Sequence, residues 1–558
     1  LCLNHGIKAI ETVDGDGKYT KNLPLFEGTH IFKANPIVIE KLNGEKKLLS
    51  SGELIHSYPH SWRSKAPLVH RATPQWFISM ESHGLRKKAL KALDDTKFYP
   101  DKGRERIKAM IETRPDWCVS RQRVWGVPLP IFVHKTTKEV LADNEVNENI
   151  ASIYEKEGSD CWFSDNPQRF LGDKYKAEDY DKMSDIVEVW FDSGCTHAFV
   201  LEKREDLQWP ASMYLEGSDQ HRGWFHSSLL ESCGTRGRAP YESILSHGFV
   251  VDGKGLKMSK SLGNVIAPED ILKKYGADIL RIWVASSNYA EDLRIDYSIL
   301  EQHADSYRKI RNTFRYLLGN LNDDFNKIDI EKLDIEQLPE LEQYMLHRVF
   351  ELNKNFKNYF QSYDFHNLYK ELLNFCTVDL SAFYFDIRKD ALYCDSKDSQ
   401  RRKSCIVVLN IILESLIKWF APILSFTTEE IFTLISKDNK SIHLEKFMEF
   451  PKSFVNIKLN EKWIELKKIR DICNISIEAK RGNKEIGSSL EAGLSISVNK
   501  KIFDITKNTD FSELCITSYA TIKIGDTEEI KALTTKADGN KCPVCWKINK
   551  DKCTRHGA

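Results

Sequence analysis

The spacing of apolar and polar residues divides the chain into regions of different predicted structure. Between residues 186 and 300, short apolar runs end at glycine or Asp-Gly turns and alternate with helical patterns; the runs are IVEVWF (186–191), ASMYLE (211–216) and ILSHGFVVD (244–252). This alternation predicts a parallel α/β fold. In such sheets ligands bind beyond the carboxyl ends of the strands, so we expect these three strand ends to lie together in one site.

Residues 301–484 carry apolar positions at helical spacing almost throughout, which predicts a helical bundle. The most apolar stretch, IVVLNIILESLIKWFAPIL (406–424), places Asn410, Glu414 and Lys418 four residues apart on one face. It therefore predicts a helix with a single polar stripe, with an i,i+4 pair between Glu414 and Lys418, and no membrane span.

The two ends of the chain are less regular. Residues 1–55 predict short strands and turns, and 56–185 are rich in Trp, Arg and Pro without a sustained helical period, as is typical of insertions in a larger fold. Residues 485–540 return to short strands, and 541–558 form a Cys-rich tail. A chain of 558 residues predicts several domains.

Charge and cysteine usage narrow the classes of partner and compartment. The 81 Lys and Arg residues balance 81 Asp and Glu residues, so binding to nucleic acid or to an anionic membrane must use local patches. Thirteen cysteines, spread over a long chain without a secretory pattern, predict a reducing compartment, which we take to be the cytoplasm. The chain begins at Leu1 without methionine, and we expect it to be a fragment of a longer protein.

The strongest chemical signal is the loop GFVVDGKGLKMSKSLGN (248–264), which follows a predicted strand and precedes a helix opened by Pro268. Lys257 and Lys260 lie on a glycine-flanked loop and can close over a polyphosphate, each as a movable charge with three hydrogen-bond donors. A solvated basic loop is the alternative interpretation of such a Lys- and Ser-rich segment.

The tail contains two pairs of potential metal ligands, each pair separated by two residues: Cys542 and Cys545, then Cys553 and His556. Three thiolates and an imidazole suit a tetrahedral structural zinc, and in a reducing compartment a disulfide is the weaker alternative. Residues 541–558 also carry five Lys or Arg residues against one Asp, a basic patch that can contact RNA phosphates.

Several strings resemble one known family. LKMSKSLGN (256–264) resembles the KMSKS loop of class I aminoacyl-tRNA synthetases, and its residues Lys257, Met258, Ser259, Lys260 and Ser261 match that motif. The strings that resemble the isoleucine, valine and leucine branch are RPDWCVSRQRVWGVPLP (114–130), VEVWFDSG (187–194), MYLEGSDQHRGWF (213–225) and VDLSAFYFDIRKDALYCD (378–395). With GSSLEA (487–492) and the Cys-rich tail, the last is most similar to bacterial isoleucine-specific members, and the resemblance covers Leu1 to Ala558.

The resemblance implies an α/β Rossmann-like class I synthetase catalytic core, represented by its C-terminal part, followed by an all-α anticodon-binding bundle, a small α+β junction and a zinc-binding tail. The implied domains are a remnant of the editing insertion (1–55), the return to the catalytic core with connective insertions (56–185), the second half of the Rossmann-like domain (186–300), the anticodon-binding domain (301–484), the junction (485–540) and the tail (541–558).

The implied activity is ATP-dependent activation of L-isoleucine and its transfer to tRNA(Ile), by a cytoplasmic monomer that uses ATP with Mg²⁺ as substrate and holds one structural Zn²⁺. Lys257 and Lys260 would be the catalytic residues. Glu216 would accept the ammonium of the amino acid, and Trp190 and Trp224 would wall its side-chain pocket. The other residues implied to contact the adenylate are Gly217, Asp219, Gln220 and His247. Core packing is the alternative for the two tryptophans and for His247, and Asp192 is either a helix cap or a site residue.

The chain also departs from the family pattern. Class I synthetases carry a His-x-Gly-His motif that contacts the ATP phosphates, whereas His5-Gly6, His83-Gly84 and His247-Gly248 all lack the second histidine. The strings that form the editing pocket are also missing, so we expect the chain to begin inside the editing insertion and to be inactive alone. Related tails place a cysteine where His556 stands and use a longer spacer. A valine- or leucine-specific synthetase and a non-catalytic tRNA-binding module remain the alternatives.

Overall fold

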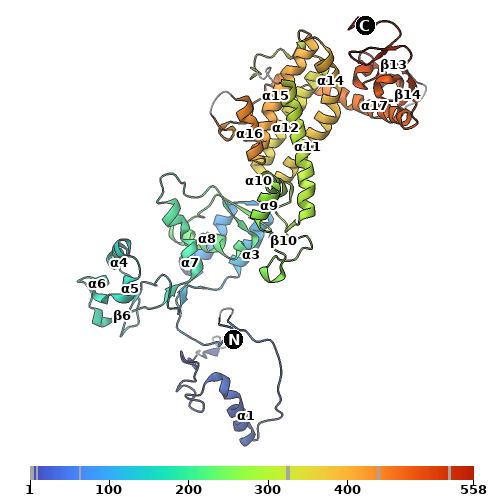
Figure 1. The fold of residues 1–558 in the computed structure, drawn as a ribbon. Helices are drawn as coiled ribbons and strands as arrows, with labels where there is room; N and C mark the ends of the chain where they lie inside the picture. The colour runs from blue at the N-terminus through green and yellow to red at the C-terminus, as the bar shows by residue number, and fades with distance from the viewer. Residues whose placement is uncertain are drawn as a thin grey trace. The chain divides into compact units, whose positions relative to one another are not determined.

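The computed structural model describes residues 5–7, 10–61, 64–321, 327–436, 440–525 and 529–557. It divides into two compact units whose elements are labelled in Figure 1. Unit 1 comprises Leu1–Leu215 and Asp219–Ile244, and unit 2 comprises Glu216–Ser218 and Leu245–Ala558. The division passes through two strands of one three-stranded sheet of order β2-β9-β8, after Leu215 in β8 and after Ile244 in β9.

Unit 1 contains short helices and strands. Its helices are α1 (Ala34–Gly44), α2 (Leu85–Asp94), α3 (Lys102–Glu112), α4 (Asn144–Glu157), α5 (Cys161–Ser164), α6 (Pro167–Leu171), α7 (Val189–Gly194) and α8 (Trp224–Thr235). Its strands are β1 (Phe77–Ile78), β2 (Lys97–Tyr99), β3 (Trp117–Cys118), β4 (Ser120–Arg121), β5 (Phe132–His134), β6 (Tyr180–Lys182) and β7 (Ile186–Val187), with the shared strands β8 (Tyr214–Gly217) and β9 (Ser243–His247).

Two hydrophobic cores stabilise unit 1. One forms where α2 and α3 pack with α8, and it includes Leu93, Ile107 and Leu229, all fully buried. The other surrounds Trp162 between β5 and α4–α6. The sequence of 56–185 shows no sustained helical period because α2, α3 and α4 are amphipathic over only 10 to 14 residues and alternate with turns. In 1–55 the helix α1 replaces part of the expected strands.

Two of the predicted strands are also different in the structure. IVEVWF contains only the two-residue strand β7, because the Glu188 carboxylate accepts a hydrogen bond from the Trp190 backbone N–H at 3.0 Å and begins helix α7. β7 pairs antiparallel with β4 and lies outside the β2-β9-β8 sheet, so the prediction that this segment is a strand of the parallel sheet is wrong. ILSHGFVVD is divided at Gly248, where a side chain would collide with the Glu291 backbone.

Unit 2 is mostly helical. Its helices are α9 (Pro268–Tyr275), α10 (Ala277–Ser286), α11 (Tyr297–Leu321), α12 (Glu340–Ser362), α13 (Phe365–Asn374), a π-helical segment (Phe375–Tyr384), α14 (Phe385–Cys394), α15 (Gln400–Phe420), α16 (Ser425–Ile435), α17 (Ile457–Gly482), α18 (Lys500–Thr506) and α19 (Phe511–Leu514). Its strands are β10 (Val250–Asp252), β11 (Leu293–Ile295), β12 (Ala492–Val498), β13 (Tyr519–Ile524), β14 (Lys531–Lys536), β15 (Asn540–Lys541) and β16 (Ile548–Asn549).

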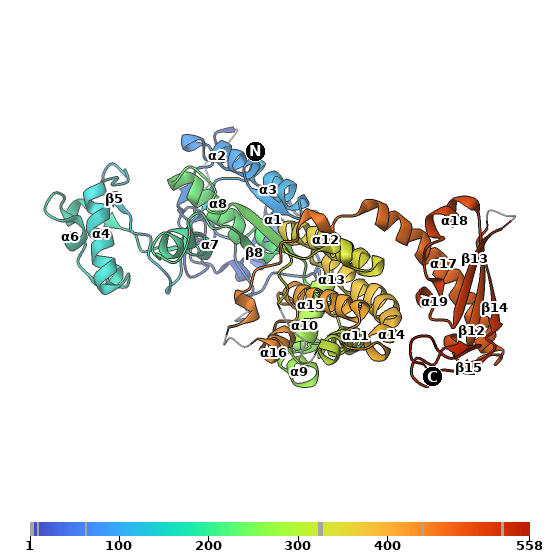
Figure 2. The ribbon, with the colours of Figure 1, turned by 90° about the horizontal axis from the view of Figure 1, so that it is seen from above.

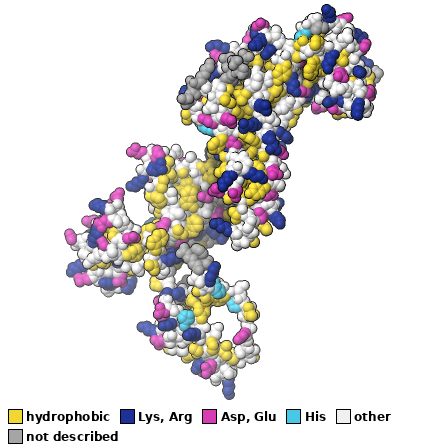
Figure 3. All heavy atoms as spheres, in the orientation of Figure 1, with side chains coloured by type: hydrophobic (Ala, Val, Ile, Leu, Met, Phe, Trp, Pro, Cys, Tyr) yellow, Lys and Arg dark blue, Asp and Glu magenta, His cyan; other side chains and the backbone are white. Residues whose placement is uncertain are grey.

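The predicted helical bundle is present as α11 to α17. Helix α15 is its most buried helix, and its polar stripe is satisfied internally: the Lys418 amine lies 2.8 Å from the Glu414 carboxylate, as the sequence predicts. No helix among the described residues is long and apolar enough to cross a membrane. On the face drawn in Figure 3, acidic and basic side chains are interspersed over the bundle, in agreement with the balanced charge of the chain.

A buried ion pair lies inside the bundle. The Arg388 guanidinium on α14 donates to both oxygens of Glu342 on α12, at 2.6 and 2.5 Å, and both side chains are almost fully buried. Arg388 also contacts Glu513 of α19 at 2.7 Å, and Glu513 in turn accepts from Arg401 of α15 at 2.8 Å. These charges connect the bundle to the C-terminal module.

Helix α10 holds the corner between α15 and α16. The Asp278 carboxylate accepts hydrogen bonds from the Thr427 backbone N–H and hydroxyl at 2.8 and 2.6 Å, so it caps α16 from a distant part of the sequence. Arg281 donates to the carbonyl oxygens of Pro422 and Ile423 at 2.7 and 2.9 Å. Because α9 and α10 directly follow the 248–264 loop, these contacts attach the loop segment to the bundle.

The C-terminal module is a three-stranded sheet of order β13-β12-β14, in which β12 pairs parallel with β13 and antiparallel with β14. Figure 2 shows α17 and α19 beside this sheet. Ala492, Leu494, Ile496 and Val498 alternate along β12 and are buried, as the strand pattern of LSISV predicts. The prediction of strands in 485–540 is confirmed, with β14 as an additional member.

Candidate functional site

The 257–261 loop is held in shape by polar contacts beyond the lysines. The Ser259 hydroxyl caps a short 3₁₀ helix (Lys260–Leu262) by accepting from the Leu262 N–H at 3.3 Å. Asn264 accepts from the Ser259 N–H at 2.9 Å and donates to the Asp252 carboxylate at 2.9 Å. The Asn264 hydrogen bond is the main cause that lowers the pKa of Asp252. The positioning role of Asn264 was not predicted from the sequence, where this residue only ends the string LKMSKSLGN.

Lys257 and Lys260 project from this framework. Both are exposed, and neither forms an ion pair with any residue that the structure describes. Met258 lies between them and packs against the small core around Ile271 and Trp283. Two mobile cations on a fixed backbone can therefore bind a polyphosphate without first losing an internal partner.

In unit 1, the Trp190 ring on α7 lies against Gly223, the residue before Trp224 and helix α8. Gly223 permits this approach, because a side chain there would lie 2.8 Å from the Trp190 ring. The Trp224 indole donates to the Ser193 carbonyl at 3.0 Å and stacks on Tyr214 with ring centroids 4.0 Å apart. Trp224 is thus fixed by packing, whereas Trp190 remains 40% exposed and forms an apolar wall.

A buried carboxylate lies beneath α7. Glu231 of α8 packs against Gly194, where any side chain would collide with it, and its carboxyl accepts no N–H or O–H hydrogen bond from the described residues; its one hydrogen-bonding neighbour there is the Cys195 thiol. Burial raises the pKa of Glu231 to about 8, and the negative charges of Asp192 and Glu188 act in the same direction. Glu231 is therefore protonated near neutral pH. Its buried position is not evident from sequence, since glutamate is rarely buried without a partner.

The remaining predicted site residues are distributed over both units. Asp219 and Gln220 belong to unit 1, where the Gln220 side-chain oxygen accepts from the Trp224 backbone N–H at 3.0 Å. Glu216, Gly217 and His247 belong to unit 2; Glu216 is exposed at the end of β8, and the His247 ring contacts the Gly248 carbonyl at 2.8 Å.

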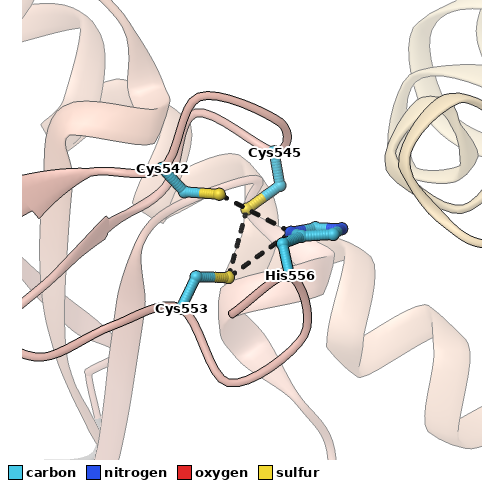
Figure 4. A group of neighbouring side chains, drawn as sticks. All are labelled: Cys542, Cys545, Cys553 and His556. Atoms are coloured by element: carbon cyan, nitrogen blue, oxygen red, sulfur yellow. Dashed lines mark hydrogen bonds between the residues drawn. The ribbon is translucent and has the colours of Figure 1, made fainter. Parts of the chain in front are cut away.

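The four tail residues form one cluster, drawn in Figure 4. Their potential ligand atoms lie within 4.8 Å of one another, and Cys542, Cys545 and Cys553 are buried. The His556 Nδ1 atom lies 3.6 Å from the Cys542 sulfur and 3.4 Å from the Cys553 sulfur, and the sulfurs of Cys545 and Cys553 are 3.9 Å apart. Tetrahedral zinc, with Zn–S near 2.3 Å and Zn–N near 2.0 Å, requires separations of roughly 3.5 Å (S to N) and 3.8 Å (S to S). The four residues fit that ion.

The groups around the cluster favour the protonation states that metal ligands need. Backbone N–H groups, that of Cys545 first, lower the pKa of the Cys542 thiol to about 6, which favours the thiolate that a metal requires. The Nε2 atom of His556 lies 3.1 Å from the Cys394 carbonyl at the end of α14. A carbonyl can only accept, so Nε2 carries the proton and Nδ1 is the nitrogen that faces the three sulfurs. Arg555 pairs with Asp390 and Asp395 and fixes the tail to the C-terminal end of α14.

These features define a class. The family described as tRNA synthetases class I (I, L, M and V) matches residues 10–296, and the anticodon-binding domain of tRNA ligases matches residues 342–498. The chain belongs to the class I tRNA synthetases of this group. It combines a class I catalytic domain with an anticodon-binding domain, as its sequence predicts.

Particular relatives are isoleucine–tRNA ligases. That of Pelagibacter ubique (strain HTCC1062) is 88% identical over 556 residues, which cover 100% of this chain and 61% of the relative. That of Brucella abortus (strain 2308) is 45% identical over 97% of this chain and 58% of its own length, and that of Zymomonas mobilis is 45% identical over 98% and 60%. The chain thus spans about three fifths of the length of these curated relatives.

One solved structure supports the fold. Methionyl-tRNA synthetase of Mycobacterium tuberculosis, in complex with methionyl-adenylate, superposes with a TM-score of 0.50 at 15% identity, over 69% of this chain and 68% of that one. At this identity the likeness concerns the fold alone.

Proposed function

We propose that the protein of which this chain is part is an isoleucine–tRNA ligase of the cytoplasm. The observation that carries the proposal is the 88% identity, over the whole chain, to a relative of that name. In this reaction the isoleucine carboxylate attacks the α-phosphorus of ATP and pyrophosphate leaves. A terminal ribose hydroxyl of tRNA(Ile) then accepts the acyl group from the adenylate. Both steps proceed without a protein nucleophile, so the protein contributes positioning and charge stabilisation.

The residues can be given roles that suit their chemistry. Lys257 and Lys260, exposed and without ion pairs among the described residues, stabilise the departing pyrophosphate of Mg²⁺-ATP. Trp190 and Trp224 wall the pocket for the isoleucine side chain, and Trp224 is fixed by its hydrogen bond to the Ser193 carbonyl. Glu216 is exposed at a strand end and is available to the substrate ammonium. The adenylate is contacted by the remaining predicted residues, Gly217, Asp219, Gln220 and His247.

The tail cluster holds one structural Zn²⁺ in this proposal. Support comes from the three sulfurs and the Nδ1 atom at separations that match a tetrahedral ion. The ion supplies no chemistry to aminoacylation; it ties Cys542, Cys545, Cys553 and His556 into a rigid tail beside the bundle. The nearby basic side chains then face RNA in a fixed arrangement.

A second function is favoured by one observation. The 558 residues contain no His-x-Gly-His string, so the polypeptide as given lacks one side of an ATP site. By itself it would act as a tRNA-binding module without turnover. We expect binding of tRNA(Ile) by this chain and catalysis only by a longer form.

The experiment is isoleucine-dependent exchange of pyrophosphate into ATP, with valine and leucine in parallel. This chain should be inactive, and a protein extended to the length of the curated relatives should exchange with isoleucine. In the extended protein, Lys260→Ala should slow exchange by about 100-fold, whereas Lys254→Ala, an exposed lysine on the same loop, should not. Activity with valine or leucine alone would overturn the assignment, and vigorous exchange by this chain would overturn its inactivity.

A further inference from the structure

Unit 1 contains a cavity of about 330 Å³, and Trp190 is the one residue of its lining that also has a role in the proposed reaction. It lies on the side of α7 where Glu188 caps the helix, and the lining that matters here consists of Arg114, Trp117, Glu188, Trp190, Arg222 and His226. We refer to it as the arginine pocket. These residues come from the segment that follows α3, from α7 and from the start of α8, so the fold assembles them from three separate parts of the chain.

Arg114 is the inner cation of the arginine pocket. Its guanidinium lies over the Trp117 ring, 5.3 Å from the ring centroid, and its Nε atom is buried without a hydrogen-bond acceptor among the described residues. Burial lowers the pKa of Arg114, although the guanidinium stays charged at neutral pH. A buried guanidinium N–H without an acceptor is costly, so the pocket favours a ligand that supplies one.

The carboxylates of the arginine pocket are already engaged. Glu188 accepts the Trp190 backbone N–H at 3.0 Å and faces Arg121 at 3.7 Å. Asp116, also in the lining, accepts the Met80 backbone N–H at 2.9 Å. Together with the exposed Arg222, the described lining holds three arginines against two carboxylates. The pocket is therefore positive and has more donors than acceptors.

His226 forms part of the buried wall. It is 2% exposed in the first turn of α8, and neither ring nitrogen has a hydrogen-bond partner in the part of the chain that the structure describes. Burial, with the charge of Arg114 as a second cause, lowers the pKa of His226 to about 3. The ring is therefore neutral at pH 7 and offers one N–H donor without adding charge.

We propose that the arginine pocket binds a phosphate group, with Arg114 as the inner bidentate donor, the His226 N–H as a neutral donor and Arg222 at the mouth. A dianionic group with several terminal oxygens can satisfy two guanidinium groups and an imidazole at once, which a single carboxylate cannot. Free inorganic phosphate and a phosphate of an RNA strand share this chemistry. The RNA source rests on the proposed function, and the free-phosphate source does not.

The test is calorimetric titration of this chain with inorganic phosphate in chloride buffer at about 0.1 M ionic strength, where non-specific attraction is screened. Saturable binding is expected, and Arg114→Met should weaken it at least about tenfold. The matched control is Arg238→Met, an exposed arginine of unit 1 that pairs with Glu242 at 2.7 Å, and it should bind as the unchanged chain does. Absence of saturable binding, or equal weakening by both substitutions, would overturn the proposal.

Two further variants guard against a folding artefact. Arg222→Met changes an exposed side chain and should also weaken phosphate binding without changing the circular dichroism spectrum. Arg114→Lys keeps the charge but not the planar fork, so its affinity should fall between those of the unchanged chain and Arg114→Met. If both variants fold and bind phosphate like the unchanged chain, the assignment fails.

The source is decided by competition with a short single-stranded RNA. If the pocket takes an RNA phosphate, inorganic phosphate should displace the RNA from the unchanged chain but not from Arg222→Met. If saturating phosphate leaves RNA binding unchanged, free phosphate is the ligand. Isoleucine-dependent exchange by the extended protein is measured independently, so failure of the pocket and failure of the proposed function are distinguishable.

Discussion

At the scale of single residues, two glycines determine how closely α7 and α8 approach each other, because glycine has no side chain. Gly194 leaves room for the buried carboxyl of Glu231, and Gly223 leaves room for the ring of Trp190. Both glycines occur in strings that sequence reasoning singled out, WFDSG and HRGWF. Their role could not be predicted, because a glycine in sequence does not reveal which distant side chain occupies the space beside it.

Glu231 makes the stability of unit 1 depend on pH. Its pKa is about 8 in the folded chain and near 4.5 when exposed, so between these values the folded state binds more protons than the unfolded state. Its contribution to the free energy of unfolding is therefore present in full below about pH 4.5 and is lost as pH rises towards 8, by at most a few kcal/mol. Glu231→Gln should remove this loss. Urea unfolding at pH 5.5 and 8 measures the difference, and parallel pH profiles of the two proteins would contradict it.

The metal cluster gives a second prediction for single residues. One equivalent of zinc should copurify with the chain, and Cys542→Ser should release it, because three ligands hold the ion far more weakly than four. Cys394→Ser is the matched control: Cys394 contacts His556 through its backbone carbonyl, which the substitution preserves, and a serine hydroxyl can replace the thiol that contacts the Val544 carbonyl at 3.5 Å. Metal analysis by atomic emission checks both variants. Retention of a full equivalent by Cys542→Ser would rule out the ligand assignment.

At the scale of elements, α10 stabilises the turn between α15 and α16 through hydrogen bonds. Leu424, the residue before α16, provides no side-chain cap, and Asp278 supplies the missing acceptor from almost 150 positions earlier in the chain. Arg281 satisfies carbonyl groups at the end of α15 in the same way. Long-range caps of this kind leave no local sequence signal, whereas the start of α9 at Pro268 was predictable.

Substitution of Asp278 should destabilise the first turn of α16. Asp278→Ala removes the acceptor for the Thr427 N–H and hydroxyl, and it should lower the free energy of unfolding by about 1–2 kcal/mol. Hydrogen exchange of the peptide that contains Ser425–Ile435 should accelerate. Asp305→Ala, an exposed carboxylate on α11 that pairs with Arg308, is the control and should change neither quantity noticeably. Equal exchange in the two variants would show that α16 needs no external cap.

At the scale of the whole chain, the parts that sequence reasoning predicted well are those with long, regular patterns. The bundle of α11 to α17, the buried strand β12 and the cluster of three cysteines and one histidine all follow from spacing in the sequence. The N-terminal unit was predicted poorly because its helices are short and its strands often span two residues. The arginine pocket was missed for a related reason: Arg114 is far in sequence from Arg222 and His226 and shares no motif with them.

The buried pair of Arg388 and Glu342 has a consequence for the descent of this protein. Loss of either side chain alone leaves the other charge in an apolar interior, at a cost of about 3–5 kcal/mol, while replacement of both by apolar residues is tolerated. A lineage can therefore leave this state only through an intermediate less stable than its ancestor and its descendant. Because Arg388 also contacts Glu513, the exchange would have to involve the C-terminal module as well. Positions 388 and 342 are therefore expected to change together.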